Sequence, residues 1–253
     1  MSSQTAVPAL TRTVAPWLKR GVDLVYPRNC QGCSTPLEEA TAGVLCGHCL
    51  GGAKYIKLPY CERCSLPFDG AVDDSFTCGY CHELKFQFTR AVAACRAEGI
   101  VRDSIHRFKY NRQMYFGYHL AEWMIAVARE RIDWGQVDAI VPVPLHPRRK
   151  REREFNQAEY LARALERVFR KPMDHRSLRR TKDTGTQTAL GAEARRQNLR
   201  DAFTVRDPAP FKGKRLVLVD DVFTTGATMD SCSRALRRAG AQDVVALAVA
   251  RGV

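Results

Sequence analysis

Four Cys-x-x-Cys pairs in the first third of the chain restrict its fold more than any other feature of the sequence. They contain eight of the ten cysteines, and the gaps between successive pairs are 12, 11 and 13 residues. Two residues between cysteines allow one tight turn to present both sulfurs to a tetrahedral ion at about 2.3 Å. The paired cysteines are Cys30, Cys33, Cys46, Cys49, Cys61, Cys64, Cys78 and Cys81. Their spacing predicts two closed structural zinc sites, each with four thiolates.

The simplest pairing is sequential, with the first four cysteines on one zinc ion and the last four on another. Spacing alone leaves a crossed pairing open. Iron–sulfur clusters, redox dithiols and disulfides are the alternatives. A redox site needs one exposed pair beside a βαβ pattern, whereas this chain has four evenly spaced pairs. Since this region has few large apolar side chains, we expect zinc to hold its roughly 60 residues together.

The stretch 217–228 carries the strongest functional signal. An apolar run ends in Asp220 and Asp221, a small hydroxyl-rich loop follows, and a helical pattern then begins. This layout turns backbone N–H groups and a helix N-terminus toward a phosphate, and Gly226 allows close backbone approach. The paired acids are suited to accept hydrogen bonds from two sugar hydroxyls or to hold Mg²⁺ through water. The loop consists of Thr224, Thr225, Gly226, Ala227 and Thr228.

This segment closely resembles the phosphoribosyl pyrophosphate (PRPP) signature of type I phosphoribosyltransferases. The match covers the apolar run, both acids and the whole loop. The resemblance implies that Asp220 and Asp221 bind the ribose diol as catalytic residues, that the loop holds the 5′-phosphate, and that the substrate is Mg²⁺–PRPP. A Walker phosphate loop does not fit, because no Gly-x-x-x-x-Gly-Lys-Ser/Thr pattern occurs.

The pattern of the chain changes at Thr89, where strand-like runs begin to alternate with helical periodicity. Strands are expected at 91–95, 139–144, 215–220 and 244–249, and helices at 100–110, 115–131, 156–169 and 227–239. The alternation predicts an α/β fold with a doubly wound, mostly parallel sheet. Ligands of such sheets bind beyond the carboxyl ends of the strands, where Asp220 and Val143 would lie.

These patterns divide the chain into three predicted regions. They are an N-terminal amphipathic helix within 1–28, a double zinc ribbon at 29–88 and a phosphoribosyltransferase-like domain at 89–253. We also expect that no segment spans a membrane. No apolar run approaches the 18 residues that a span requires. The N-terminus lacks the basic and apolar regions of a signal peptide, so we expect a cytoplasmic protein.

The net charge of +13 comes entirely from residues 90–253, which hold 32 basic and 19 acidic side chains. Residues 1–89 are balanced, with 8 of each sign. Because the basic part also carries the phosphate signature, we expect a polyanionic partner such as a diphosphate, nucleic acid or both. A solubilising, arginine-rich surface is the alternative.

Two basic segments are further candidates for contact with the ligand. Residues 148–153 place five cations in six positions, and we expect a loop whose Arg148, Arg149 and Lys150 hold the diphosphate. The segment 179–200 is typical of a mobile loop that closes over a charged substrate, or of a plain surface loop. Lys109 is a separate candidate for a ligand phosphate. The second segment contains Arg179, Arg180, Lys182, Gly185, Gln187, Arg195, Arg196, Asn198 and Arg200.

Taken together, these motifs resemble the ComF family, which joins a zinc ribbon to a phosphoribosyltransferase-like domain. The resemblance rests on the cysteine series, the PRPP signature, and the motifs at 108–110, 141–145, 153–157 and 187–198. It implies a link to DNA uptake and natural transformation, with single-stranded DNA as a suspected ligand and no established acceptor. The family pattern Arg-Gly-Phe-Asn-Gln has Glu154 in place of glycine here. If that glycine needs a positive φ, the turn must differ in this chain.

The sequence leaves three hypotheses for function. An enzyme would let an acceptor nitrogen displace diphosphate from PRPP through an oxocarbenium-like state. A nucleic-acid adaptor would keep the pocket as a sensor or relic, track phosphates with its basic half, and stack bases on Tyr110, Tyr115 or Phe116. A regulator would bind PRPP or a nucleotide and signal through the zinc region. The phosphate site is common to all three.

Overall fold

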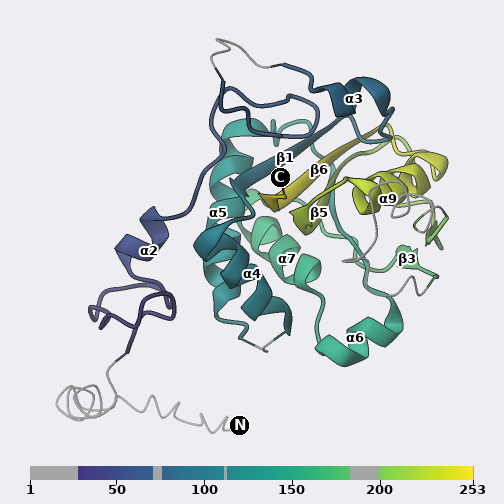
Figure 1. Cartoon of the computed structure of the whole chain (residues 1–253). Coiled ribbons are helices and arrows are strands. Elements are labelled where there is room, and N and C mark those ends of the chain that lie inside the picture. Colours follow the sequence, from purple (N-terminus) through teal and green to yellow (C-terminus); the bar gives the residue numbers. More distant parts are fainter. Residues whose placement is uncertain (1–27, 71–75, 111–112, 183–198, 200, 253) are drawn as a thin grey trace, which may run out of the picture. The chain divides into compact units, whose positions relative to one another are not determined.

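The computed structural model describes residues 28–70, 76–110, 113–182, 199 and 201–252. The predicted N-terminal helix lies outside these residues, as do six positions of the second basic segment: Gly185, Gln187, Arg195, Arg196, Asn198 and Arg200. Backbone contacts divide the chain into two compact units, 1–46 and 47–253 (Figure 1). The predicted region boundaries at 28 and 88 stay predictions.

The larger unit is built on a four-stranded parallel sheet with the order β1-β6-β5-β2. Its nine-residue strand β5 lies between β6 and β2 and is buried along most of its length. The predicted α/β fold with a parallel sheet is therefore confirmed, with strand bounds a few residues from those expected. The strands are β1 (Arg90–Arg96), β2 (Ala139–Pro142), β5 (Arg215–Phe223) and β6 (Asp243–Arg251).

Helices cover both faces of this sheet, as a doubly wound fold requires. Figure 1 shows α5 and α7 on one side of the sheet and α9 on the other. Leu216 and Leu218 of β5 belong to a buried cluster with Met229 and Leu236 of α9, as expected for alternate residues of one strand face. The helices are α4 (Gly99–Tyr110), α5 (Phe116–Arg131), α7 (Gln157–Phe169) and α9 (Ala227–Arg238).

The basic stretch after β2 forms a helix, α6 (Pro147–Arg153), so the expected loop is wrong here. Proline suits the first turn of a helix, and Arg148 pairs with Glu152 one turn later at 3.2 Å. The helix ends at Glu154, which has a left-handed φ of 67°. This chain therefore has a positive φ at the position where the family pattern has glycine, although it carries a side chain there.

A two-stranded antiparallel sheet lies apart from the main one and consists of β3 (Leu178–Arg180) and β4 (Phe203–Val205). Two short helices lie in the cysteine-rich part of the chain, α2 (Gly47–Gly51) and α3 (Gly79–Glu83). None of the helices in the described part of the chain combines the length and apolar composition needed to cross a bilayer.

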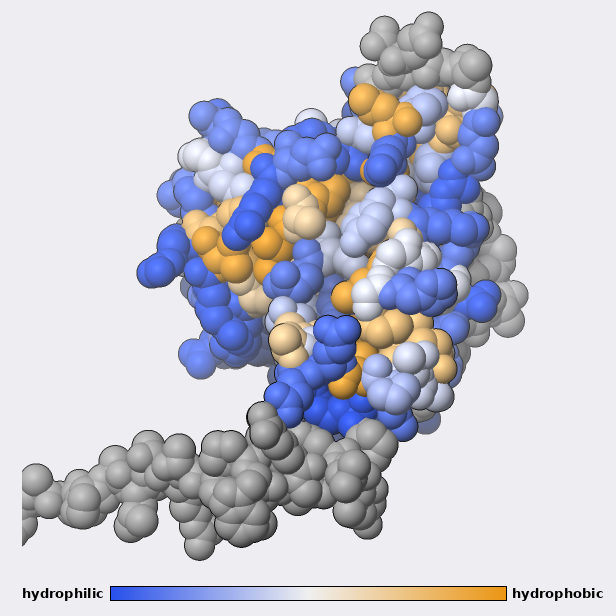
Figure 2. Space-filling view, turned by 90° about the vertical axis from the view of Figure 1, so that its left-hand side faces the viewer, coloured by the Kyte–Doolittle hydropathy of each residue, from blue (hydrophilic) through white to orange (hydrophobic). Residues whose placement is uncertain are grey.

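The surface of the molecule is mainly hydrophilic on the face shown in Figure 2, with apolar patches between the polar side chains. Several large apolar or aromatic side chains near the start of α5 are exposed, among them Tyr110, Met114 and Tyr115. Phe116, by contrast, is 1% exposed and packs inside. The aromatic side chains of this region therefore divide into core residues and surface residues.

Candidate functional site

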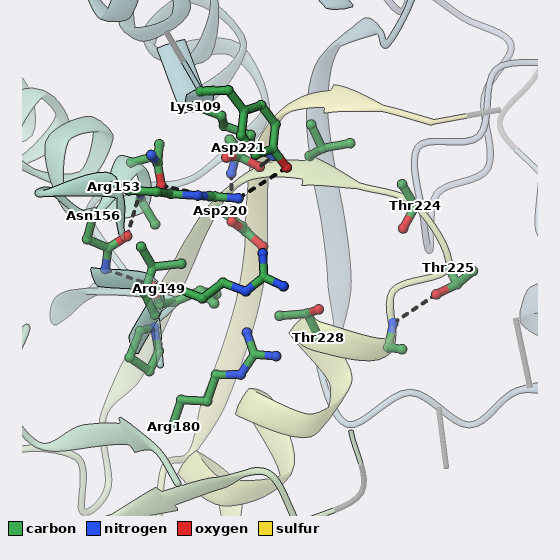
Figure 3. A pocket seen from close by; sticks show the side chains of 18 residues that line it. Lys109, Arg149, Arg153, Asn156, Arg180, Asp220, Asp221, Thr224, Thr225 and Thr228 are labelled. Atoms are coloured by element: carbon green, nitrogen blue, oxygen red, sulfur yellow. Dashed lines mark hydrogen bonds and ion pairs between the residues drawn. The ribbon is translucent and has the colours of Figure 1, made fainter. Parts of the chain in front are cut away.

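A cleft of about 320 Å³ opens at the carboxyl ends of β2 and β5. Its walls come from segments far apart in the sequence, namely the end of α4, α6, the start of α7, β3 and the start of α9 (Figure 3). This is where ligands bind in open parallel sheets. Among the predicted site residues, those that line the cleft are Lys109, Arg149, Asp220, Asp221, Thr224, Thr225, Ala227 and Thr228.

The two aspartates of β5 have different surroundings within this cleft. Asp221 is 5% exposed, and its Oδ1 lies 2.6 Å from Nζ of Lys109. Asp220 is half-buried and accepts a hydrogen bond of 2.9 Å from the Asp221 backbone N–H. Burial raises the pKa of Asp220 to about 7, and the nearby charge of Asp221 adds to that rise, while Lys109 opposes it. The positive charge of Lys109 therefore acts on both acids of the pair.

The loop between β5 and α9 has the features of an anion site. Gly226 has a φ of 76° and directly precedes the first residue of the 12-residue helix α9. The N–H groups of Thr225 and Gly226 donate to no backbone carbonyl of the described residues. Unbonded backbone donors at the N-terminus of a helix attract an anion, since the helix dipole adds positive potential there.

Only one of the three predicted cations of α6 lines the cleft. Arg149 does so, and Figure 3 shows its guanidinium extending toward the same space as that of Arg180 from β3. Arg148 is paired with Glu152 on an exposed surface, and Lys150 lines other surface pockets. Because successive residues of a helix point about 100° apart, three consecutive side chains cannot all face one ligand.

Two clusters of four cysteines confirm the predicted sequential pairing. Within each cluster, the sulfur atoms lie within 4.8 Å of one another. Four sulfurs at this separation suit a tetrahedral Zn²⁺ ion, which leaves no open coordination position. The clusters are Cys30, Cys33, Cys46 and Cys49, and Cys61, Cys64, Cys78 and Cys81.

Backbone N–H groups support the thiolate form in both clusters. Cys46 donates to Sγ of Cys30 at 3.2 Å, and Cys78 donates to Sγ of Cys61 at 3.3 Å. Burial raises the pKa of Cys30, but N–H groups of Cys46, Cys33 and Gly32 outweigh it and lower this pKa to about 6. A lowered thiol pKa favours metal binding near neutral pH, because the ligand is the thiolate.

Comparison with known proteins agrees with this architecture. Residues 21–85 match the double zinc ribbon domain, and residues 156–252 match the phosphoribosyl transferase domain. Competence protein F of Haemophilus influenzae is 33% identical over 81% of this chain and 90% of its own length. DNA utilization protein YhgH of Escherichia coli K12 is 32% identical over 87% of this chain and 96% of its own. The chain belongs to the ComF family.

A more distant ComF relative is competence protein ComFC of Streptococcus pneumoniae, which is 24% identical over 76% of this chain and 74% of its own. Membership confirms the resemblance inferred from the cysteine series and the PRPP signature. It also agrees with the structure, in which a zinc-ribbon region and a phosphoribosyltransferase-like domain follow one another. The function of each site residue in this ComF protein stays a proposal.

Several cleft residues were not assigned to the site from sequence. Asn156 caps α7 by accepting from the Ala158 N–H at 3.1 Å, and its Nδ2 donates to the Val143 carbonyl at 3.0 Å. The helical pattern predicted a helix that starts near Asn156 but not this hydrogen bond to the end of β2. Arg180 belongs to the second basic segment, which was predicted as a candidate for contact with the ligand, and the pairing of β3 with β4 brings it to the cleft.

Proposed function

We propose that this ComF family protein binds Mg²⁺–PRPP in the cleft and transfers its phosphoribosyl group to a nitrogen acceptor. The loop between β5 and α9 is the observation that carries the proposal. Separated from the adjacent acids by two residues, it places threonine hydroxyls, a helix N-terminus and two N–H groups that donate to no backbone carbonyl of the described residues. A ligand with a terminal phosphate near a vicinal diol matches this order of groups.

The cleft offers a place for each part of PRPP. The loop 224–228 would hold the 5′-phosphate, and Asp220 and Asp221 would accept hydrogen bonds from the ribose hydroxyls. Arg149 and Arg180 would face the diphosphate from α6 and β3. Lys109 keeps two further donors beyond its contact with Asp221, since an ammonium group carries three.

The proposed reaction is a substitution at the anomeric carbon. The lone pair of the acceptor nitrogen forms the new C–N bond, the C–O bond to diphosphate breaks, and diphosphate leaves with that electron pair. The acceptor nitrogen then loses its proton to solvent. Arg149 and Arg180 stabilise the negative charge that develops on the leaving group. Mg²⁺, when bound with the substrate, would neutralise part of the same charge, and the two aspartates could hold it through water.

The biological setting is inferred from the relatives. Two relatives that are more than 30% identical to this chain are named competence protein F and DNA utilization protein. We therefore infer a role in handling incoming DNA, on the cytoplasmic side, where reducing conditions keep zinc-binding thiols reduced. The acceptor would then belong to the same process, as a nucleobase, an amine or single-stranded DNA itself.

Binding of single-stranded nucleic acid is a second candidate function, favoured by one observation at the edge of the cleft. Tyr110 is 51% exposed and Tyr115 is 43% exposed, so part of each side chain is accessible to a base. The guanidinium of Arg153 stacks over Tyr110 at 4.9 Å and adds a cation beside it. Phe116 was also expected to stack on bases, but its burial prevents this.

A binding experiment tests the second candidate. We expect single-stranded DNA to bind with an affinity that falls as salt rises, and Tyr110→Ala to weaken binding by about 1–3 kcal/mol. Val168→Ala, which changes an exposed side chain on α7, is the control and should bind normally. Binding that is independent of salt and of Tyr110 would rule out this surface as the nucleic-acid site.

Release of diphosphate tests the transferase proposal. Zinc-loaded protein would be incubated with Mg²⁺–PRPP and, in turn, nucleobases, amines and single-stranded DNA. We expect release with one acceptor class, lost in Asp221→Asn and retained in Asp103→Asn, which alters an exposed acid on α4. If no acceptor of any class consumes PRPP, the transferase part of the proposal is wrong.

A further inference from the structure

The second cysteine cluster contacts the loop proposed to hold phosphate, although the two are more than 140 residues apart in sequence. Tyr80 lies in α3, between Cys78 and Cys81, and its hydroxyl donates to the Thr225 carbonyl at 3.1 Å. A side chain fixed between two metal ligands therefore holds a peptide group of the loop.

Arg251 makes a second connection between the same two parts. It ends β6, and its side chain is buried, with 6% of the residue exposed. Its Nε donates to the Cys64 carbonyl at 3.1 Å, and its Nη1 donates to the carbonyls of Thr224 at 2.7 Å and Phe223 at 3.3 Å. One guanidinium thus joins a cysteine turn to two peptide groups of the loop. Such bonds are what make the burial of a guanidinium tolerable.

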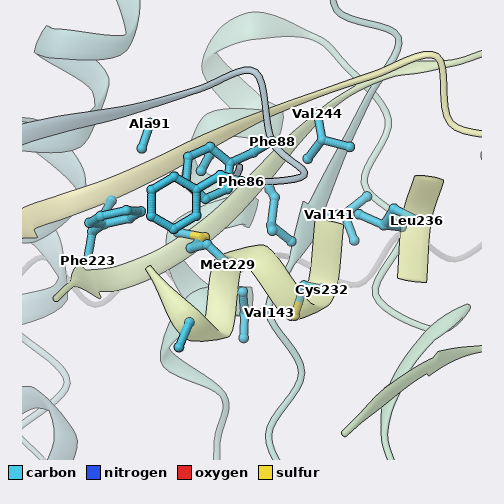
Figure 4. Packing of buried hydrophobic residues seen from close by; sticks show 14 of the residues in the cluster. Phe86, Phe88, Ala91, Val141, Val143, Phe223, Met229, Cys232, Leu236 and Val244 are labelled. Atoms are coloured by element: carbon cyan, nitrogen blue, oxygen red, sulfur yellow. The ribbon is translucent and has the colours of Figure 1, made fainter. Parts of the chain in front are cut away.

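Aromatic packing forms the third connection. Phe86, five residues after Cys81, stacks on Phe88 with ring centroids 4.6 Å apart and lies edge-on to Phe223 (Figure 4). A Cβ atom added to Gly226 would lie 3.1 Å from Cε1 of Phe86 and 2.7 Å from Cζ of Phe223. The left-handed glycine of the loop therefore rests directly on rings that pack against the second cluster.

These contacts determine which way the loop presents its N–H groups. In a trans peptide, the carbonyl of one residue and the N–H of the next point in opposite directions. Tyr80 and Arg251 hold the carbonyls of Thr225 and Thr224, so the N–H groups of Gly226 and Thr225 point away from the ribbon. Those are the N–H groups that donate to no backbone carbonyl of the described residues.

We propose that zinc in the second cluster sets the geometry of the phosphate-binding loop, so that zinc and PRPP stabilise each other's binding. The proposal rests on the proposed function, because it takes this loop as the phosphate site. Zinc fixes the backbone at Cys64 and at residues 78–81, from which two of the three connections to the loop start. Coupling between two binding sites is reciprocal, so ligand in the loop strengthens zinc binding by the same free energy as zinc strengthens ligand binding.

Zinc release tests the reciprocal part of the proposal. Full-length, zinc-loaded protein would be mixed with a chromogenic zinc chelator, with and without saturating Mg²⁺–PRPP. We expect PRPP to slow the release of one of the two zinc ions, and to raise the equilibrium affinity for that ion by about fivefold or more, as typical couplings do. The other ion should leave at the same rate in both conditions.

Two matched variants test whether the Tyr80–Thr225 hydrogen bond carries the coupling between zinc and PRPP. Tyr80→Phe removes only the hydroxyl that donates to Thr225, and it should weaken PRPP affinity about two- to tenfold and reduce zinc protection. Tyr118→Phe removes an exposed hydroxyl on α5 and should change neither quantity. Arg251→Lys is a second variant, in which lysine cannot donate to the Cys64 and Thr224 carbonyls at once as the guanidinium does. Provided that circular dichroism shows it folded, it should reduce PRPP affinity and zinc protection more than Tyr80→Phe does.

The outcomes distinguish this proposal from the function on which it rests. If calorimetry shows normal PRPP binding while both zinc ions leave at rates independent of PRPP, the coupling is wrong and the function stands. The coupling is also wrong if Tyr80→Phe and Tyr118→Phe protect zinc equally. If zinc-loaded wild type binds no PRPP, both proposals fail.

Discussion

Asp220 shows how the surroundings of a single residue tune this site. It sits next to a second acid, and burial and that neighbouring charge raise its pKa from the ordinary 3.8 to about 7. A carboxyl of this kind is protonated in the free protein at mildly acidic pH. It becomes a better acceptor for ribose hydroxyls, and a better partner for Mg²⁺, when it ionises. The site therefore favours ligand binding at neutral and higher pH.

The same shift makes the stability of the free protein depend on pH. Because the folded-state pKa lies above the unfolded one, the folded state is penalised increasingly as pH rises from about 4 to about 7. Asp220→Asn removes the penalty, so we expect it to stabilise the protein more at pH 8 than at pH 5.5, by roughly 1–3 kcal/mol. Urea unfolding of both proteins at the two pH values measures this. A gain that is equal at both values would contradict the assigned pKa.

Gly226 is the residue of the loop that tolerates a side chain least. Gly226→Ala should weaken PRPP binding and destabilise the fold, because it adds backbone strain at a φ of 76° and a clash with Phe223. Gly213→Ala is the matched control, with a φ of 71° but nothing within 4 Å of the added Cβ. Thermal unfolding and calorimetry should show a larger loss for Gly226→Ala. Equal losses would mean that packing against the loop is unimportant.

Helix α6 is the element whose form most affects the site. The run of five cations was predicted to be a basic loop, but Pro147 and the Arg148–Glu152 pair support a helix instead. Consecutive side chains of a helix point in different directions, so Arg149 lines the cleft whereas Lys150 lines a different surface pocket. Net charge along the segment therefore matters less than the face on which each cation lies.

Substitutions within α6 test whether only the cation that faces the cleft contributes to ligand binding. Arg149→Ala should lower the affinity for Mg²⁺–PRPP by about 1.5–3 kcal/mol, the range for hydrogen bonds to charged groups. Lys150→Ala removes the same charge from the next position and should leave the affinity nearly unchanged. Calorimetric titration of both variants at one salt concentration makes the comparison. Equal losses would show that the helix acts through its overall charge.

The sequence was sufficient to predict those helices and strands that depend on local patterns. Alternating periodicity predicted the parallel sheet, and the acid pair with its loop predicted where β5 gives way to α9. The sequence did not predict side-chain contacts between residues that are far apart in the chain. Arg180 comes to the cleft only through the β3–β4 pairing, and Arg251 has no local motif, although it joins Cys64 to Thr224. Such contacts depend on the full set of neighbours, which spacing does not specify.

At the scale of the whole molecule, the two cysteine clusters differ in how deeply their cysteines are buried. The second cluster forms part of the buried core of the larger unit, together with Phe86, Phe88 and Phe223. The first includes Cys33, which is exposed. Zinc in the second cluster therefore contributes to the packing of the domain that contains the cleft. This arrangement gives a zinc ribbon a physical connection to a phosphoribosyltransferase-like site.

The central claim is that the cleft of this ComF protein binds Mg²⁺–PRPP through its acid pair and loop. The most direct test is calorimetric titration of Mg²⁺–PRPP into zinc-loaded wild type, the Asp220→Asn/Asp221→Asn double variant and the Asp103→Asn control. We expect saturable binding of one ligand per chain in wild type and control, and none in the double variant. Absence of binding to folded wild type, or equal binding to the double variant, would contradict the account.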